Sequence, residues 1–161
     1  LRTGEQLYDL IEADALEPSM SYSGNLYSRE FFELGRSRLA EGGFVCTYVP
    51  TERTRRTVAG VFPHILDFHS QNFASFIIPG NEPLEFDADL VRRRLHAPEV
   101  QRYLQASGER ERTTRLVERF LDQVSVVVID DSNRERYTAG DVNTDLFPRD
   151  EFDKHYDGNY K

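Results

Sequence analysis

The chain has 161 residues, which is enough for one domain with a hydrophobic core. Its hydrophobic content of 39% and charged content of 30% are ordinary for a globular protein. The formal net charge of -8 argues against a role in binding nucleic acid, because phosphate contacts need clustered Lys and Arg. We therefore expect no nucleic-acid partner.

The first fifty residues predict a βαβ unit. Residues 7–13 are short and mostly apolar, which indicates a strand. A helix is expected from Ser28, whose hydroxyl can cap its first turn, to the pair Gly42-Gly43, which favours a helix end. A second strand is expected over residues 44–49. Two strands joined by a crossover helix should be parallel.

An acidic segment follows the first predicted strand. Asp14 and Glu17 lie three residues apart, just past its carboxyl end. In open parallel sheets, ligands bind outside the carboxyl ends of the strands. A carboxylate there can accept a proton or attract a cationic substrate. The segment is the best candidate for chemistry, although such loops are also often acidic only for turn formation and solubility.

The next segment predicts a helix and a hairpin. Thr51 is a plausible N-cap for a helix that ends before Pro63. Its three arginines, Arg53, Arg55 and Arg56, could bind an anion, but a solvated outer face is the favoured interpretation. Residues 64–68 and 73–78 are expected to form a hairpin that closes the sheet.

One cluster in that hairpin raises the hypothesis of a metal site. His64, Asp67 and His69 are all possible ligands. Alternation along a strand would place His64 on the opposite face from the other two. We therefore expect no metal.

The turn cluster at residues 79–83 is the best domain boundary, separating residues 1–80 from 81–161. Beyond it we expect a helix capped by Asp87, a second that begins near Pro98, and a third over residues 109–121. A strand over residues 124–129 and a polar tail follow, and the tail is expected to be loosely ordered from Asp150 onward.

Several motifs together resemble the second half of the spermidine synthase family. They are Tyr8-Asp9-Leu10-Ile11, the run from Asp14 to Pro18, and the run from Gly24 to Leu34. The similarity is greatest to the branch often fused to bacterial membrane segments, which Phe62-Pro63-His64 and the run from Asn143 to Arg149 also resemble. The match covers residues 7–68 well and the tail near Asn143 loosely.

The resemblance implies a fold and a reaction. The fold would be α/β, the C-terminal half of a Rossmann-like, S-adenosylmethionine-dependent methyltransferase fold. It would have parallel strands, a terminal antiparallel hairpin and a helical C-terminal extension. The reaction would move an aminopropyl group from decarboxylated S-adenosylmethionine to a small-molecule amine.

The resemblance also implies roles for particular residues. Asp14 matches the first loop acid of the family, a candidate base that would contact the cofactor together with Ala15. Glu17 stands where the family usually has a second Asp, and the side chain of Glu17 is one methylene longer than that of Asp. Glu17, Tyr27 and Asp145 would bind the substrate.

Other features depart from that family. No G-x-G-x-x-G pattern follows a strand, so we expect the nucleotide-cradling half to lie outside this chain. Thr47-Tyr48 stands where the family often has Gln. Three functions stay open: an aminopropyltransferase, a methyltransferase of the same fold acting with S-adenosylmethionine, and a non-catalytic module related to spermidine synthase.

Further expectations concern the state of the chain. Because it begins just before a strand and not with Met, we expect a piece of a longer protein, inactive alone. An exposed sheet edge favours association into a homo-oligomer. The single cysteine, Cys46, fits a reducing compartment, and no apolar run reaches the roughly 18 residues of a membrane helix. We expect a cytoplasmic location, and the cytoplasmic domain of a membrane-fused protein stays open as an alternative.

Overall fold

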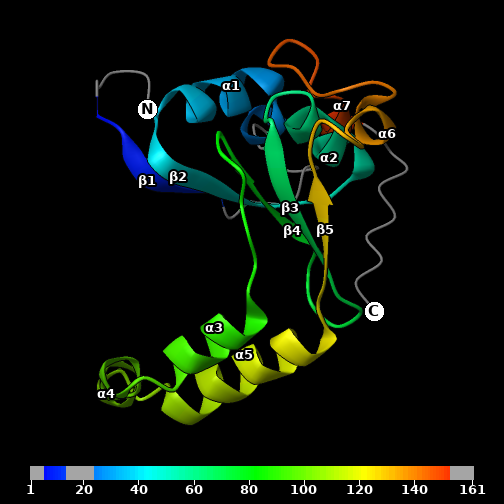
Figure 1. Cartoon of the computed structure of the whole chain (residues 1–161). Coiled ribbons are helices and arrows are strands. Elements are labelled where there is room, and N and C mark those ends of the chain that lie inside the picture. The colour runs from blue at the N-terminus through cyan, green and yellow to red at the C-terminus, as the bar shows by residue number, and fades with distance from the viewer. Residues whose placement is uncertain (1–5, 14–23, 153–161) are drawn as a thin grey trace.

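The computed structural model describes residues 6–13 and 24–152 (Figure 1). The strands in these ranges are β1 (Tyr8–Ala13), β2 (Leu39–Tyr48), β3 (His64–His69), β4 (Phe76–Gly80) and β5 (Ser125–Ile129). The helices are the 3₁₀ helix η1 (Gly24–Tyr27), α1 (Arg29–Ser37), α2 (Glu52–Ala59), α3 (Ala88–Leu95), α4 (Pro98–Ala106), α5 (Arg110–Gln123), α6 (Glu135–Thr138) and α7 (Arg149–Phe152).

The five strands form one mixed sheet in the order β1-β2-β4-β3-β5. β1 and β2 are parallel, with Leu10 opposite Phe44 and Ala13 opposite Thr47. β4 pairs antiparallel with both β2 and β3, and β5 pairs antiparallel with β3. The predicted parallel pair and hairpin are therefore confirmed, and the chain is a mixed α/β protein. The second strand of the hairpin, β4, is the one that adjoins the parallel pair.

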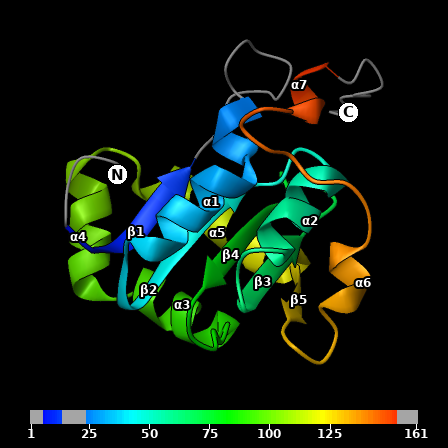
Figure 2. The same cartoon turned by 90° about the horizontal axis from the view of Figure 1, so that it is seen from above.

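The helices α1 and α2 cover one face of the sheet, and the core lies between them and the strands (Figures 1 and 2). Ile11, Val45, Ile65, Ile77 and Ile129 contribute from the strands, and each is at most 9% exposed. Apolar side chains from the helical layer complete the core; they include Tyr27, Phe32, Val58, Ala59 and Phe62.

The start of α1 agrees with the sequence and its end does not. The Ser28 hydroxyl accepts a hydrogen bond from the Phe31 amide at 3.1 Å, so the predicted cap is confirmed. The expected helix end at Gly42-Gly43 is wrong, because α1 ends at Ser37 and both glycines lie in β2.

Those glycines accommodate an irregularity in the parallel pair. Gly42 has a φ of 68°, a left-handed conformation that glycine adopts without strain. The register between β1 and β2 shifts between Tyr8 and Leu10. A Cβ atom on Gly43 would lie 2.7 Å from the Tyr8 carbonyl oxygen, so the two backbones approach too closely for a side chain.

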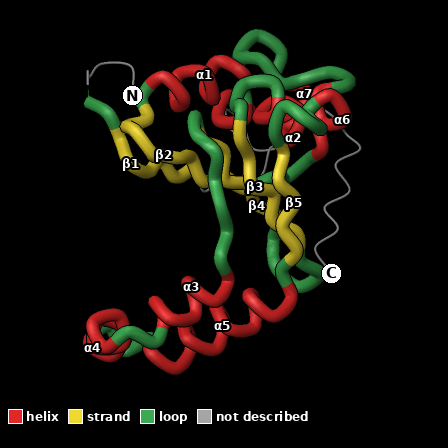
Figure 3. The backbone as a smooth tube through the Cα atoms, in the orientation of Figure 1, coloured by secondary structure: helices red, strands yellow, loops and turns green. Residues whose placement is uncertain are grey.

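The helices α3, α4 and α5 form an arm that extends away from the sheet (Figures 1 and 3). The Asp87 cap and the start at Pro98 are confirmed. Aromatic packing attaches the arm to the sheet: Phe86 lies edge-on to Phe68 at 5.1 Å, and Phe120 packs against Phe73 at 5.5 Å. After the arm, β5 returns to the same sheet, so both sides of the expected boundary near residue 80 contribute strands to it.

The face of the sheet opposite α1 and α2 is less well covered. Leu10 on β1 is 50% exposed, and Phe44 and Cys46 on β2 are partly buried. Within the described ranges, β1 has a pairing partner on one side only. None of the helices in the described part of the chain has the length and apolar character needed to cross a membrane.

Candidate functional site

Three strands have their carboxyl ends on the same side of the sheet, which we call the carboxyl edge. β1 and β2 are parallel, and β3 runs the same way because both β2 and β3 are antiparallel to β4. Their carboxyl ends are Ala13, Tyr48 and His69, and α1 and α2 begin after the first two. This carboxyl edge is where parallel sheets place their ligands.

Three of the predicted site residues, Asp14, Ala15 and Glu17, lie outside the described residues. The residue before them, Ala13, is the last of β1, and its carbonyl oxygen accepts a hydrogen bond from the Thr47 hydroxyl at 3.3 Å. The strand that precedes the acidic segment in the sequence therefore ends at the carboxyl edge.

The other two predicted residues lie near the start of α1 in different environments. Tyr27 has no exposed surface and packs in the core, which argues against its predicted contact with substrate. Asp145 is brought from the tail to the first turn of α1, where its carboxylate accepts a hydrogen bond from the Ser28 hydroxyl at 2.5 Å. The Asp145 amide donates to Glu30 Oε2 at 2.9 Å. The Glu30 carboxylate thus contacts the backbone of Asp145 at the start of α1.

The tail fastens the starts of both helices, and we call residues 141–150 the tail clasp. Asp150 is 2% exposed and accepts hydrogen bonds from Thr51 Oγ1 at 2.6 Å, Thr54 Oγ1 at 3.2 Å and Asn143 Nδ2 at 2.7 Å. Its carboxylate also forms an ion pair with Arg53. The expectation that loose order begins at Asp150 is therefore wrong for Asp150 itself, whereas residues 153–161 lie outside the described residues.

The clasp also bonds α1 through its backbone. The Arg29 amide donates to the Asn143 carbonyl oxygen at 2.9 Å, and the Asn143 amide donates to Thr57 Oγ1 at 3.0 Å. Asn143 is fully buried. Asn143 thereby links the two helices, a contact that the sequence analysis did not predict.

The arginines of α2 do not form a solvated face, so that prediction is wrong. The side chains of Arg53, Arg55 and Arg56 are 16%, 9% and 27% exposed. Asp141 of the clasp pairs with Arg53 at 3.1 Å and with Arg56 at 3.4 Å. Partial burial alone would raise the pKa of Asp141, but the charge and hydrogen bond of Arg53, with the charges of Arg149 and Arg56, lower it.

Arg55 faces the sheet and forms a buried array with two residues of β3. Its Nε lies 2.8 Å from Asp67 Oδ2, and Asp67 has no exposed surface. The same oxygen lies 3.1 Å from Nε2 of His69. Burial would lower the pKa of Arg55, but a hydrogen bond to Glu52 and the charge of Asp67 raise it, so the guanidinium stays charged.

Asp67 and His69 are on one side of β3, as alternation predicts. In the part of the chain that the structure describes, no group of three or more His, Cys, Asp or Glu residues is arranged to hold a metal ion.

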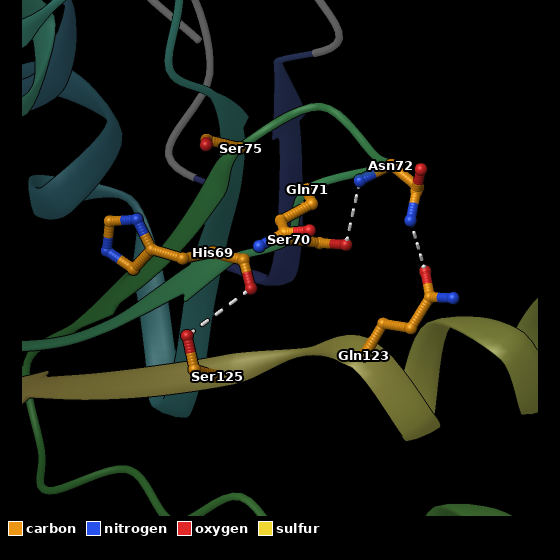
Figure 4. A pocket seen from close by; sticks show the side chains of 7 residues that line it. All are labelled: His69, Ser70, Gln71, Asn72, Ser75, Gln123 and Ser125. Atoms are coloured by element: carbon orange, nitrogen blue, oxygen red, sulfur yellow. Dashed lines mark hydrogen bonds between the residues drawn. The ribbon is translucent and has the colours of Figure 1, made fainter.

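A pocket of about 550 Å³ lies at the carboxyl end of β3, beside this array (Figure 4). The Asn72 side-chain amide donates to Gln123 Oε1 at 2.9 Å, which ties the loop after β3 to the end of α5. In Figure 4 the His69 ring and the Asn72–Gln123 pair lie on opposite sides of Ser70 and Gln71. The lining residues are His69, Ser70, Gln71, Asn72, Ser75, Gln123 and Ser125.

Comparison with protein-family models gives no match for this chain, and a search of curated proteins gives none either. The likeness to the spermidine synthase family therefore depends on the sequence motifs.

Proposed function

We propose that this chain is part of a spermidine synthase-like transferase, which moves an aminopropyl group from decarboxylated S-adenosylmethionine to a small-molecule amine. The observation that carries the proposal is the parallel pairing of β1 and β2 with α1 between them. β1 ends at Ala13, the residue before Asp14 in the sequence, and this supports a site for Asp14 and Glu17 near the carboxyl edge.

The chemistry of the transfer suits carboxylates at that position. The amine attacks a carbon next to a sulfonium, so it must first lose a proton. A nitrogen–carbon bond forms while the carbon–sulfur bond breaks, and sulfur leaves with the electron pair as a neutral thioether. Asp14 takes the proton from the amine, and Glu17 and Asp145 hold the cationic end of the acceptor.

The described residues fit a cationic ligand near α1. Glu30 and Asp145 place two carboxylates at the carboxyl edge, and the Asp145 amide is already bonded to Glu30. The clasp thereby holds Asp145 against Ser28 and Glu30 at the start of α1. This arrangement supports Asp145 as a substrate residue better than it supports Tyr27, which is buried.

The nucleotide-cradling half of the fold would come from polypeptide outside these 161 residues. The ten glycines contain no G-x-G-x-x-G pattern after a strand. The partly exposed face around Leu10 offers a surface for that half, as does the side of β1 that has no pairing partner among the described residues. We further propose a cytoplasmic location and association into a homo-oligomer.

The decisive experiment assays the longer parent protein with putrescine and either decarboxylated or ordinary S-adenosylmethionine. We expect turnover with the decarboxylated form, and a 10²- to 10⁴-fold loss of kcat/KM in Asp14→Asn, roughly the contribution of a general base. Asp9→Asn is the matched control, because Asp9 is an exposed carboxylate on β1, the strand that precedes Asp14 in the sequence.

Other results would replace the proposal. Turnover with ordinary S-adenosylmethionine alone would identify a methyltransferase of the same fold. Absence of turnover and of nucleotide binding would identify a non-catalytic module. Measurable transfer by the 161-residue chain alone would contradict the requirement for a further half.

A further inference from the structure

The arm formed by α3, α4 and α5 has little core of its own and no part in the proposed transfer. Within these three helices the buried side chains are Leu95 and Leu121, and α4 contributes none. Leu116 on α5 is 43% exposed. Much of the arm surface is therefore available for contact with another molecule.

The outer side of α5 is basic. Arg112, Arg115 and Arg119 follow one another at spacings of three and four residues, so they lie on one side of the helix. The Arg112 side chain is 77% exposed and lies 3.5 Å from Glu109. Arg115 has no carboxylate partner among the described residues. Like charges at these spacings do not stabilise the helix that carries them, so the stripe suits an acidic partner better than it suits the isolated chain.

The beginning of this stripe surrounds a hollow of about 570 Å³ between the end of α4 and the start of α5. Three arginines line the hollow, and we call Arg110, Arg112 and Arg115 the basic patch. The lining also includes one carboxylate, Glu111, and the apolar side chain of Leu116. The hollow therefore combines an excess of positive charge with an apolar wall.

The charge of the chain is divided unequally between the arm region and the rest. Residues 86–123 carry eight arginines and seven carboxylates, whereas the other residues carry 12 basic and 21 acidic side chains. A second copy of the chain therefore offers the basic patch an excess of carboxylates.

Three of those carboxylates gather around the loop after β4, and we call Glu33, Glu41 and Glu82 the acidic patch. Glu33 and Asn81 line one hollow at the end of α1. The amide of Gly42, the residue after Glu41, donates to Glu82 Oε1 at 3.4 Å. All three carboxylates belong to exposed residues, and none of them forms an ion pair with another described residue.

One cation, Arg36, lines the same hollow as Glu33. It donates to the Val61 carbonyl oxygen at 2.6 Å and to Asn81 Oδ1 at 2.9 Å. These partners are neutral, so the three carboxylates stay without a direct counter-ion and the patch keeps a net negative charge.

We propose that the basic patch of one copy binds the acidic patch of a second copy, and that a two-fold axis repeats the contact in the other direction. A two-fold dimer uses both patches of both copies. The arm projects away from the sheet (Figures 1 and 3), so its basic patch is presented to a neighbouring chain. The apolar face around Leu10 favours association of any two copies, and the charged patches select which surfaces meet. The inference rests on the proposed homo-oligomer and names its contact; it does not depend on the transferase reaction.

The test is sedimentation equilibrium of the 161-residue chain at low ionic strength. Arg112→Glu/Arg115→Glu should weaken dimerisation by about tenfold, because each exposed pair contributes little and reversal replaces attraction with repulsion. Glu33→Arg/Glu41→Arg should weaken it by a similar factor. This second variant has a smaller net charge than the unmodified chain, so general repulsion between copies predicts the opposite result.

A control variant separates the patches from the net charge. Arg94→Glu/Arg136→Glu changes the net charge by the same amount as the variant of the basic patch, at exposed positions outside both patches. It should dimerise nearly as tightly as the unmodified chain.

Mixing the two patch variants tests the complementarity directly. Each variant repels its own copies, but the reversed arm of one attracts the reversed body of the other, and their unmodified patches also attract. The mixed dimer should therefore form about as tightly as the unmodified one. Raising the salt concentration should weaken both, because salt screens exposed charges.

The inference is overturned if either patch variant dimerises like the unmodified chain, if the control is weakened as much as they are, or if mixing restores nothing. These results would leave the homo-oligomer in place with a different contact. An unmodified chain that stays monomeric at every concentration would overturn the inference and the proposed homo-oligomer together.

Discussion

Asp150 depends on partners from two parts of the chain, the α2 region and the tail. Two hydroxyls and a guanidinium of the α2 region, together with the Asn143 amide, surround a carboxylate that is 2% exposed. Hydrogen bonds to a charged group contribute about 1.5–3 kcal/mol each, more than neutral ones. Asp150 therefore stabilises the contact between the tail and the start of α2.

Asp150→Asn should lower the free energy of unfolding by about 2–4 kcal/mol, because it leaves the partly buried Arg53 guanidinium with one carboxylate fewer. Urea denaturation measures this. Asp122→Asn is the control: Asp122 also pairs with an arginine, Arg92, but its side chain is 68% exposed, so the loss should stay below about 1 kcal/mol. Equal losses in the two variants would show that the Asp150 carboxylate has no special role.

Asp141 should make stability depend on pH. Its folded pKa lies below the ordinary 3.8 because of Arg53, Arg149 and Arg56. The folded state therefore binds fewer protons than the unfolded state in this range. The stabilisation from Asp141 is complete when the pH is above the ordinary pKa of an aspartate. It is lost as the pH falls through the lower pKa that Asp141 has in the folded state. Urea denaturation at a series of acidic pH values measures how stability depends on pH. Asp141→Asn should weaken this pH dependence, and an unchanged pH dependence would contradict a lowered pKa for Asp141.

At the scale of elements, α2 is a short helix that makes contacts on several of its sides. It has eight residues, of which Thr54, Arg55, Thr57, Val58 and Ala59 are buried. One side meets β3 through the Arg55–Asp67 pair, and another meets the clasp through Thr54 and Thr57. A helix enclosed in this way can carry arginines without a solvated face.

The strand β2 depends on close backbone contact at Gly43. Gly43→Ala should cost about 1–3 kcal/mol, the usual effect of overpacking, because the added Cβ would meet the Tyr8 carbonyl oxygen at 2.7 Å. Gly60→Ala is the control, since its nearest contact is 3.4 Å and its φ of -73° suits any residue. Thermal unfolding of both variants measures the difference, and a Gly43→Ala protein as stable as Gly60→Ala would refute the close approach.

At the scale of the whole molecule, the partly uncovered face of the sheet should determine whether copies of the chain associate. Leu10 is 50% exposed on β1, and the arm attaches to the other half of the sheet, where Phe86 contacts Phe68 and Phe120 contacts Phe76. Unpaired strands and exposed apolar faces promote contact between chains. The 161-residue chain should therefore self-associate.

Sedimentation velocity tests this expectation with Leu10→Lys. A charge at that position should shift the chain toward monomer, because it cannot be buried without a partner. Tyr103→Lys, at a 74% exposed position on α4, should leave the distribution unchanged. An unmodified chain that is monomeric at all concentrations and melts at high temperature would contradict the expectation.

The sequence by itself determined the elements and their local chemistry. Ser28, Thr51 and Asp87 cap helices as predicted, and the parallel pair and the hairpin are present. These features depend on groups only a few residues apart, so periodicity and capping rules are sufficient to find them. The carboxyl edge could be predicted for the same reason, because it follows from strand direction.

Only the tertiary structure decided which polar residues are buried and what they contact. Arg53 pairs with Asp150, 97 residues away, and Ser28 bonds Asp145, 117 residues away. Gly42 and Gly43, which the sequence indicated as a helix end, belong to β2, because β1 packs beside them. No local rule records such distant partners, and the burial of a charge is stable only when those partners are present. The clasp and the Asp67 array therefore appear only once the chain has folded.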